Sequence, residues 1–80
     1  MAVNVKLVKR FKRSNVKGRR AYYWPRAISA QKKLEPGTEV LCVDDAKGIN
    51  PKLVTVMERK IAAGKISEEL FVVLLEDLAE

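Results

Sequence analysis

Residues 9–26 read KRFKRSNVKGRRAYYWPR, and together with the residues just before them they decide the expected fold. Residues 3–11 place apolar side chains at alternate positions, which is the period-two spacing of a β-strand. Residues 14–18 (SNVKG) contain asparagine and glycine, which accept the left-handed backbone angles of a turn. Residues 19–24 are rich in aromatic side chains and predict a second strand, which Pro25 ends because proline cannot donate to a ladder. The stretch therefore predicts a β-hairpin.

This predicted hairpin, centred near Val16, sorts its side chains onto two faces. Arg20, Tyr22 and Trp24 share one face, on which Lys12 stands opposite Arg20. Like charges placed opposite each other destabilise a sheet, so such a face is expected to hold an anion. A tryptophan in so small a domain more often belongs to the core than to a binding surface, and both placements of Trp24 stay open. The other face is the predicted core face and holds Val5, Leu7, Phe11, Ala21 and Tyr23.

Basic and aromatic side chains together point to a nucleic-acid partner. Residues 9–26 contain no acidic residue and four of the five aromatic residues of the chain. Lysine and arginine neutralise phosphates and release counterions, while aromatic rings stack on unpaired bases. We therefore expect a nucleic-acid-binding protein of low sequence specificity, with single-stranded DNA or RNA favoured. The predicted binding residues are Lys6, Arg10, Lys12, Arg13, Lys17, Arg19, Arg20, Tyr22, Trp24 and Arg26.

The charge of the whole chain is divided unevenly along its 80 residues. Residues 1–34 carry eleven basic and no acidic side chains, whereas residues 35–80 carry five basic and ten acidic ones. The formal net charge is +6. This asymmetry favours a polyanionic partner. Two alternatives stay open: the basic half docks on an acidic protein surface or on another copy, as in a protein-interaction or assembly module, or it balances the acidic half within the fold.

The remaining segments predict further short strands. Residues 39–43 (EVLCV) and 52–59 (KLVTVMER) have β-type composition, and Pro36 and Gly37 suit the central positions of a type II turn before the first of them. Residues 66–80 fit either a strand at 70–75 or a short C-terminal helix, and we favour the strand. The expected architecture is mainly β, a single domain over residues 1–80 forming a small half-open barrel of about five strands.

Three segments carry a resemblance to a known fold. Residues 34–41 (LEPGTEVL), the Lys47-Gly48 pair and residues 53–56 (LVTV) resemble the core of SH3-like barrels, in which a turn leads into a strand and a lysine-glycine loop leads to the next strand. The chain is also similar in pattern to small phage-encoded proteins of unassigned function that combine a Tyr-Trp segment with such a strand. The resemblance implies an SH3-like half-open barrel. SH3-like barrels bind RNA, DNA or peptides, so it does not choose the partner.

Several classes of function are not expected. The chain has no histidine, one cysteine and four scattered glycines, which argues against a zinc site, a histidine base and a phosphate-binding loop. Cys42 lies among apolar neighbours and is expected to be buried, and the acidic pair Asp44-Asp45 is expected to serve a turn. We expect no catalysis, no cofactor and no metal. No signal peptide or apolar run of membrane-spanning length is present, so we expect a cytoplasmic protein without a membrane partner.

Overall fold

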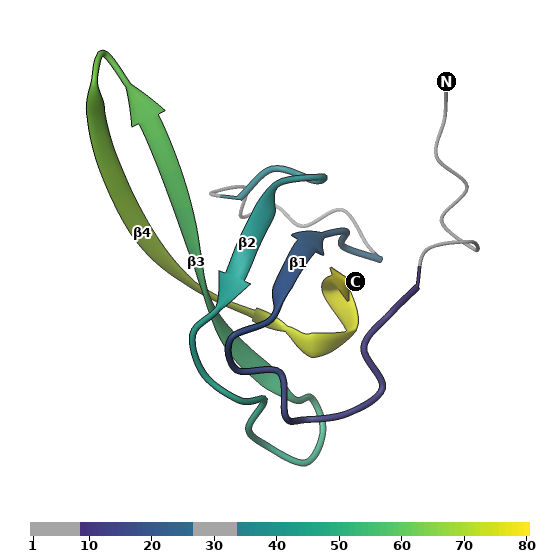
Figure 1. The fold of residues 1–80 in the computed structure, drawn as a ribbon. Helices are drawn as coiled ribbons and strands as arrows, with labels where there is room; N and C mark the ends of the chain where they lie inside the picture. The colour runs from purple at the N-terminus through teal and green to yellow at the C-terminus, as the bar shows by residue number, and fades with distance from the viewer. Residues whose placement is uncertain (1–8, 27–33) are drawn as a thin grey trace.

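A computed structural model describes residues 9–26 and 34–80 of the chain (Figure 1). The regular elements are strands with a single short 3₁₀ helix near the C-terminus of this part. Their bounds are β1 (Arg20–Tyr23), β2 (Glu39–Cys42), β3 (Leu53–Ala62), β4 (Lys65–Leu74), η2 (Leu75–Asp77) and β5 (Leu78–Ala79).

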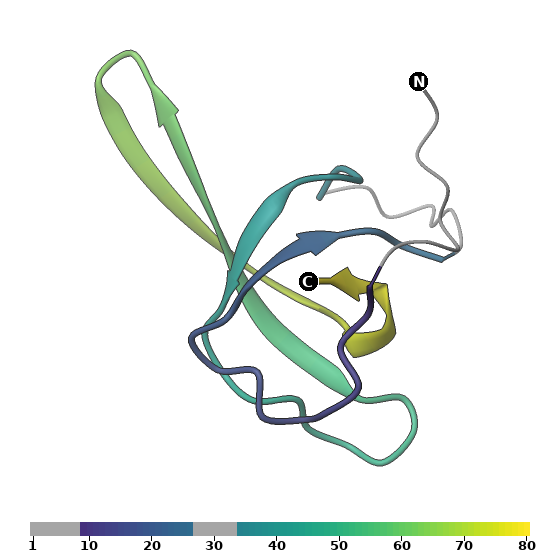
Figure 2. The ribbon, with the colours of Figure 1, turned by 45° about the vertical axis from the view of Figure 1, so that its right-hand side comes forward.

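The strands form one antiparallel five-stranded sheet in the order β4-β3-β2-β1-β5. Strands that follow one another in sequence are neighbours from β1 to β4, and then η2 turns the chain so that β5 returns to the far side of β1 (Figure 2). The sheet curls but does not close, since β4 and β5 are its two ends. The expectation of a mainly β protein with about five strands is confirmed.

The predicted hairpin between residues 3–11 and 19–24 is wrong over the described residues. Strand β1 pairs with β2 along one edge, with Arg20 opposite Leu41, and with β5 along the other, with Tyr22 opposite Ala79. Lys12 is therefore not the cross-strand partner of Arg20. The physical reason is that β2 and β5 bring buried apolar side chains to β1, whereas three of the four residues 9–12 are basic. The predicted strand residues before position 9 lie outside the described part of the chain.

One face of the sheet holds the core. The largest fully buried side chains are Leu78, Val16, Val54, Val56 and Cys42. They come from β2, β3, β5 and the loop before β1, so alternate residues of the central strands point to one interior. The predicted burial of Cys42 is confirmed, and so is the core placement of the described residues of the predicted core face. Phe11 and Ala21 are buried, and Tyr23 packs against the cluster.

The predicted turn at Pro36 and Gly37 is confirmed. The Thr38 amide donates to the Glu35 carbonyl over 3.2 Å, which closes a four-residue turn. Gly37 has φ of 88°, the left-handed value that the second central position of a type II turn requires. The turn delivers the chain into β2.

The segment 66–80 combines the two structures that its sequence left open. Strand β4 covers Lys65–Leu74, which confirms the favoured strand but starts it five residues earlier than position 70. The chain then forms a single 3₁₀ turn at Leu75–Asp77 and ends in β5. Among the residues that the structure describes, no helix has the length and apolar character needed to cross a membrane.

Strands β3 and β4 project beyond the rest of the sheet (Figures 1 and 2). They pair over their whole length, from Leu53 opposite Leu74 to Ala62 opposite Lys65, while β2 reaches only as far as Met57. Residues 58–69 therefore form a two-stranded extension, which we name the β3–β4 arm. Its tip is a two-residue turn in which Ala63 and Gly64 both have positive φ, 51° and 75°.

Candidate nucleic-acid-binding face

The face of the sheet opposite the core carries basic and aromatic side chains from neighbouring strands. Arg20 and Tyr22 are exposed on β1, while the residue between them, Ala21, is buried. This alternation confirms that Arg20 and Tyr22 share one face. A shallow depression with a volume of about 290 Å³ lies beside them. Its lining residues are Arg20, Glu39, Val40, Leu41, Met57 and Arg59.

Arg59 is the residue of this face that sequence analysis missed. It lies on β3, and the strand register aligns Arg20, Leu41 and Met57 across three strands, two residues before Arg59. Its guanidinium lies 3.7 Å from the carboxylate of Glu68, and both side chains are largely exposed. An exposed pair of this kind is weak and competes poorly with a polyanion. The signal that identifies Arg59 is the pairing register of β2 with β3, which local sequence patterns do not contain.

The three consecutive aromatic residues at the end of β1 have different environments. Tyr22 is 42% exposed, so its ring is accessible on the candidate face. Tyr23 packs against the core, and desolvation, with a smaller contribution from the charge of Asp77, raises the pKa of its hydroxyl. Trp24 is half-buried, and its ring lies close to Gly37, where a Cβ atom would come within 3.9 Å of it. Tyr22 is therefore the accessible stacking surface, and Trp24 is partly committed to packing on the turn.

The Arg10 side chain is partly buried and bonds to the main chain of two other segments. Its Nη1 donates to the main-chain carbonyl of Trp24, and to that of Glu76 over 3.1 Å. Its Nη2 is buried without a hydrogen-bond partner among the described residues. The main chain of Arg10 also bridges to Ala79 of β5. Arg10 therefore ties the N-terminal segment to the ends of β1 and η2, and it is a weak candidate for contact with a phosphate.

The other predicted basic residues spread over the surface next to the sheet. Lys12 and Arg13 are exposed in the loop before β1, and Arg26 is exposed after it. Arg19 is exposed as well, but its guanidinium lies 3.6 Å from the carboxylate of Glu80, which also lies 3.7 Å from the Lys9 amine. Lys6 lies outside the described residues. The structure thus brings Arg20 and Tyr22 together, while Lys12, Arg13 and Arg26 lie in the segments before and after β1.

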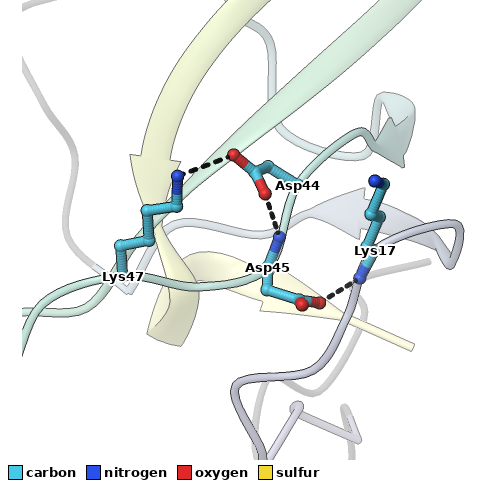
Figure 3. Close-up of polar contacts among 4 residues, drawn as sticks. All are labelled: Lys17, Asp44, Asp45 and Lys47. Atoms are coloured by element: carbon cyan, nitrogen blue, oxygen red, sulfur yellow. Dashed lines mark hydrogen bonds and ion pairs between the residues drawn. The ribbon is translucent and has the colours of Figure 1, made fainter.

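Lys17 belongs to a polar cluster that joins two loops (Figure 3). Its main-chain amide donates to the Asp45 carboxylate over 2.9 Å, and the Lys47 amine lies 3.0 Å from the Asp44 carboxylate. Asp44 also accepts from the Asp45 amide over 2.9 Å. The hydrogen bond from Lys47, helped by that amide and by the lysine charge, lowers the pKa of Asp44. The two aspartates hold the loops around β1 and β2 together, as expected of turn residues.

Groups with catalytic or metal-binding potential are few. Within residues 9–26 and 34–80, no three acidic, histidine or cysteine side chains gather as a metal site would require. The Cys42 thiol is fully buried, and its burial raises its pKa, which makes it a poor nucleophile. The exposed guanidinium groups and the Tyr22 ring are therefore the features with which this face can bind a ligand. Comparisons with protein-family models, with curated proteins and with solved structures find no match for this chain.

Proposed function

We propose that this protein is a small SH3-like β-protein that binds single-stranded nucleic acid with low sequence specificity. The observation that carries the proposal is the common exposed face of Arg20, Tyr22 and Arg59, which border one shallow depression or lie next to it. Arg20 and Arg59 with an accessible ring suit a phosphate backbone with unpaired bases. Glu39, opposite Tyr22, and Glu68, beside Arg59, lower the net charge of this face. The proposal needs no catalysis, cofactor or metal, and it places the protein in the cytoplasm.

The SH3-like part of the proposal rests on topology. The strands that come first and last in the sequence, β1 and β5, are neighbours in the sheet, and a single 3₁₀ turn separates β4 from β5. Five antiparallel strands in one curled sheet suit a half-open barrel. This arrangement agrees with the resemblance of residues 34–41 and 53–56 to SH3-like barrels.

The proposed mechanism combines charge and stacking. Arg20 and Arg59 contact phosphates from the two sides of the depression, and the ring of Tyr22 stacks on a base, which is worth about 1–3 kcal/mol. Lys12, Arg13 and the basic residues upstream add positive charge without fixing the position of the nucleic-acid strand. Because none of these contacts reads a base edge, we expect weak sequence preference and a steep dependence on salt.

The experiment is a fluorescence-anisotropy titration of labelled single-stranded DNA, single-stranded RNA and duplex DNA with the wild type and with Y22L. We expect binding of the single strands and a loss of about 5-fold to 150-fold in affinity for Y22L, which is the range that one lost stacking contact predicts. Y22F is the matched control, since it keeps the ring and should bind as wild type. No binding of any nucleic acid at low salt, or equal binding by Y22L and wild type, would overturn the proposal.

A further inference from the structure

Strand β4 leaves an unusually long open edge on the sheet. It is the terminal strand in the order β4-β3-β2-β1-β5, and its ten residues pair with β3 without a bulge. Charged side chains and proline usually protect an edge from further pairing. Between Ile66 and Leu74 the strand contains no proline or lysine, and its charged side chains are Glu68 and Glu69. Within residues 9–26 and 34–80, no strand covers this edge.

The hydrogen-bond pattern shows which residues of β4 face the open edge. Leu53 of β3 exchanges both main-chain hydrogen bonds with Lys47, and the carbonyl of Thr55 accepts from Val43. These residues therefore turn their polar groups away from β4, and the alternate residues of β3 bond to β4 instead. The register places Val54 and Val56 opposite odd-numbered residues of β4. The main-chain groups directed to the open edge belong to Ile66, Glu68, Leu70, Val72 and Leu74.

The same residues carry an exposed apolar surface. Ile66, Leu70 and Val72 are 62%, 62% and 66% exposed, and Ile61 beside them on the arm is 73% exposed. The charges on this side of the arm are Arg59 and Glu68, which form an exposed ion pair with 3.7 Å between the guanidinium and the carboxylate. This pair separates Ile61 and Ile66 near the tip from Leu70 and Val72. Exposed apolar side chains gathered on one side of a small protein favour an interaction site. A two-stranded ribbon is also marginally stable on its own and gains from a further strand.

We propose that two copies of this chain pair antiparallel through their β4 edges, with Leu70 at the two-fold axis. In this register Leu70 faces Leu70 of the other copy, Glu68 faces Val72, and Ile66 faces Leu74. All five outward-directed residues are then paired, and no like charges stand opposite each other. A register centred on Glu68 or on Glu69 would place two carboxylates face to face, which destabilises a sheet.

The self-complementary charge pattern is the reason to choose a second copy as the occupant. The edge carries one carboxylate, that of Glu68, among apolar side chains, so it repels a polyanion and offers a strongly charged protein surface a single charge to pair with. A second β4 presents the same alternation of apolar side chains with one acidic residue, and the two-fold axis places that residue opposite valine. Because the contact contains no intermolecular ion pair, it should persist at high salt.

The test is the molar mass of the full chain, measured by size-exclusion chromatography with light scattering. The wild type should have twice the mass of one chain at low and at high salt. L70K alone and L70E alone should each be monomeric, because each places like charges opposite each other at the axis. An equal mixture of L70K and L70E should restore the dimer. I61K is the matched control, an equally exposed apolar position of the arm outside the edge, and should remain dimeric.

Each other outcome would contradict the proposal. A monomeric wild type would exclude self-association. A dimer that dissociates in salt would point to contact between the basic and acidic parts of two copies instead. Loss of the dimer in I61K but not in L70K would indicate that the two sheets pack face to face. If the mixture of L70K and L70E does not form a dimer, Leu70 does not lie at the two-fold axis. Cooperative urea unfolding of L70K and L70E should match wild-type behaviour at monomeric concentrations, which shows that the variants fold.

Discussion

Among the basic residues, Arg10 is the one that we expect to stabilise the fold rather than to bind a ligand. Its guanidinium donates to the carbonyls of Trp24 and Glu76, and so joins three segments that are far apart in sequence. The variant R10K keeps the charge, but its amine ends one bond short of the Nη1 atom that makes both contacts. A hydrogen bond from a charged group contributes about 1.5–3 kcal/mol when shielded from water and less when exposed. One of the two contacts is partly buried and the other is exposed.

The buried Nη2 of Arg10 has no partner among the described residues, and relief of this cost offsets part of the loss. We therefore expect R10K to lower the free energy of unfolding by about 1–2 kcal/mol. Urea denaturation followed by the fluorescence of Trp24, the one tryptophan, measures it. R20K is the matched control and should stay within about 0.5 kcal/mol of wild type, since Arg20 is exposed. Equal stability of R10K and wild type, or equal losses in R10K and R20K, would refute the structural role of Arg10.

Three further predictions concern the arm, the core and the loop cluster. A63N should raise the free energy of unfolding by about 0.5 kcal/mol in urea denaturation, because Ala63 has φ of 51° and asparagine followed by glycine suits a two-residue turn with positive φ; a destabilised A63N would contradict this. Cys42 should react with a thiol reagent at the rate of global unfolding, since the side chain is fully buried and its pKa is raised; rapid labelling of the folded protein would contradict its core position. The folded-state pKa of Asp44 is lowered from its ordinary value of 3.8, so its contribution to stability is complete above that pH and is lost as the pH falls through the lowered pKa. Urea unfolding of wild type and D44N should therefore differ at neutral pH and converge in acid, and a constant difference would argue against the contact with Lys47.

Local patterns were sufficient to predict the positions of β1, β2 and β3 and the second half of β4, but not the two-residue strand β5. Period-two alternation identified Ala21 and Tyr23 as inward-facing and Arg20 and Tyr22 as outward-facing, and proline followed by glycine identified the turn at Pro36. Burial of Cys42 followed from its apolar neighbours. Each of these features depends on residues close to one another in sequence.

Strand pairing was not predictable in the same way. The hairpin expected within residues 3–24 used the nearest available partner, whereas β1 pairs with β5, which is more than fifty residues away. The local pattern of a strand stays the same when its partner or its register changes. The partner of β1 is therefore decided by the packing of Leu78 and Val40 in the core. Because strand pairing could not be predicted, the predicted site left out Arg59 and wrongly grouped Arg10 with Arg20. The continuation of β4 back to Lys65 was missed because Ser67 followed by Glu68 and Glu69 resembles the start of a helix.

The most direct measurement of the proposed function is the salt dependence of single-stranded DNA affinity for the wild type and for the double variant R20Q/R59Q. Each phosphate contact with a single strand contributes about 0.7 to the slope of log affinity against log salt, so loss of two contacts should reduce the slope by about 1.4. The single variant K65Q, which removes an exposed charge at the tip of the arm, should leave the slope unchanged. Equal slopes for R20Q/R59Q and wild type would contradict the account and move the binding surface away from this face of the sheet.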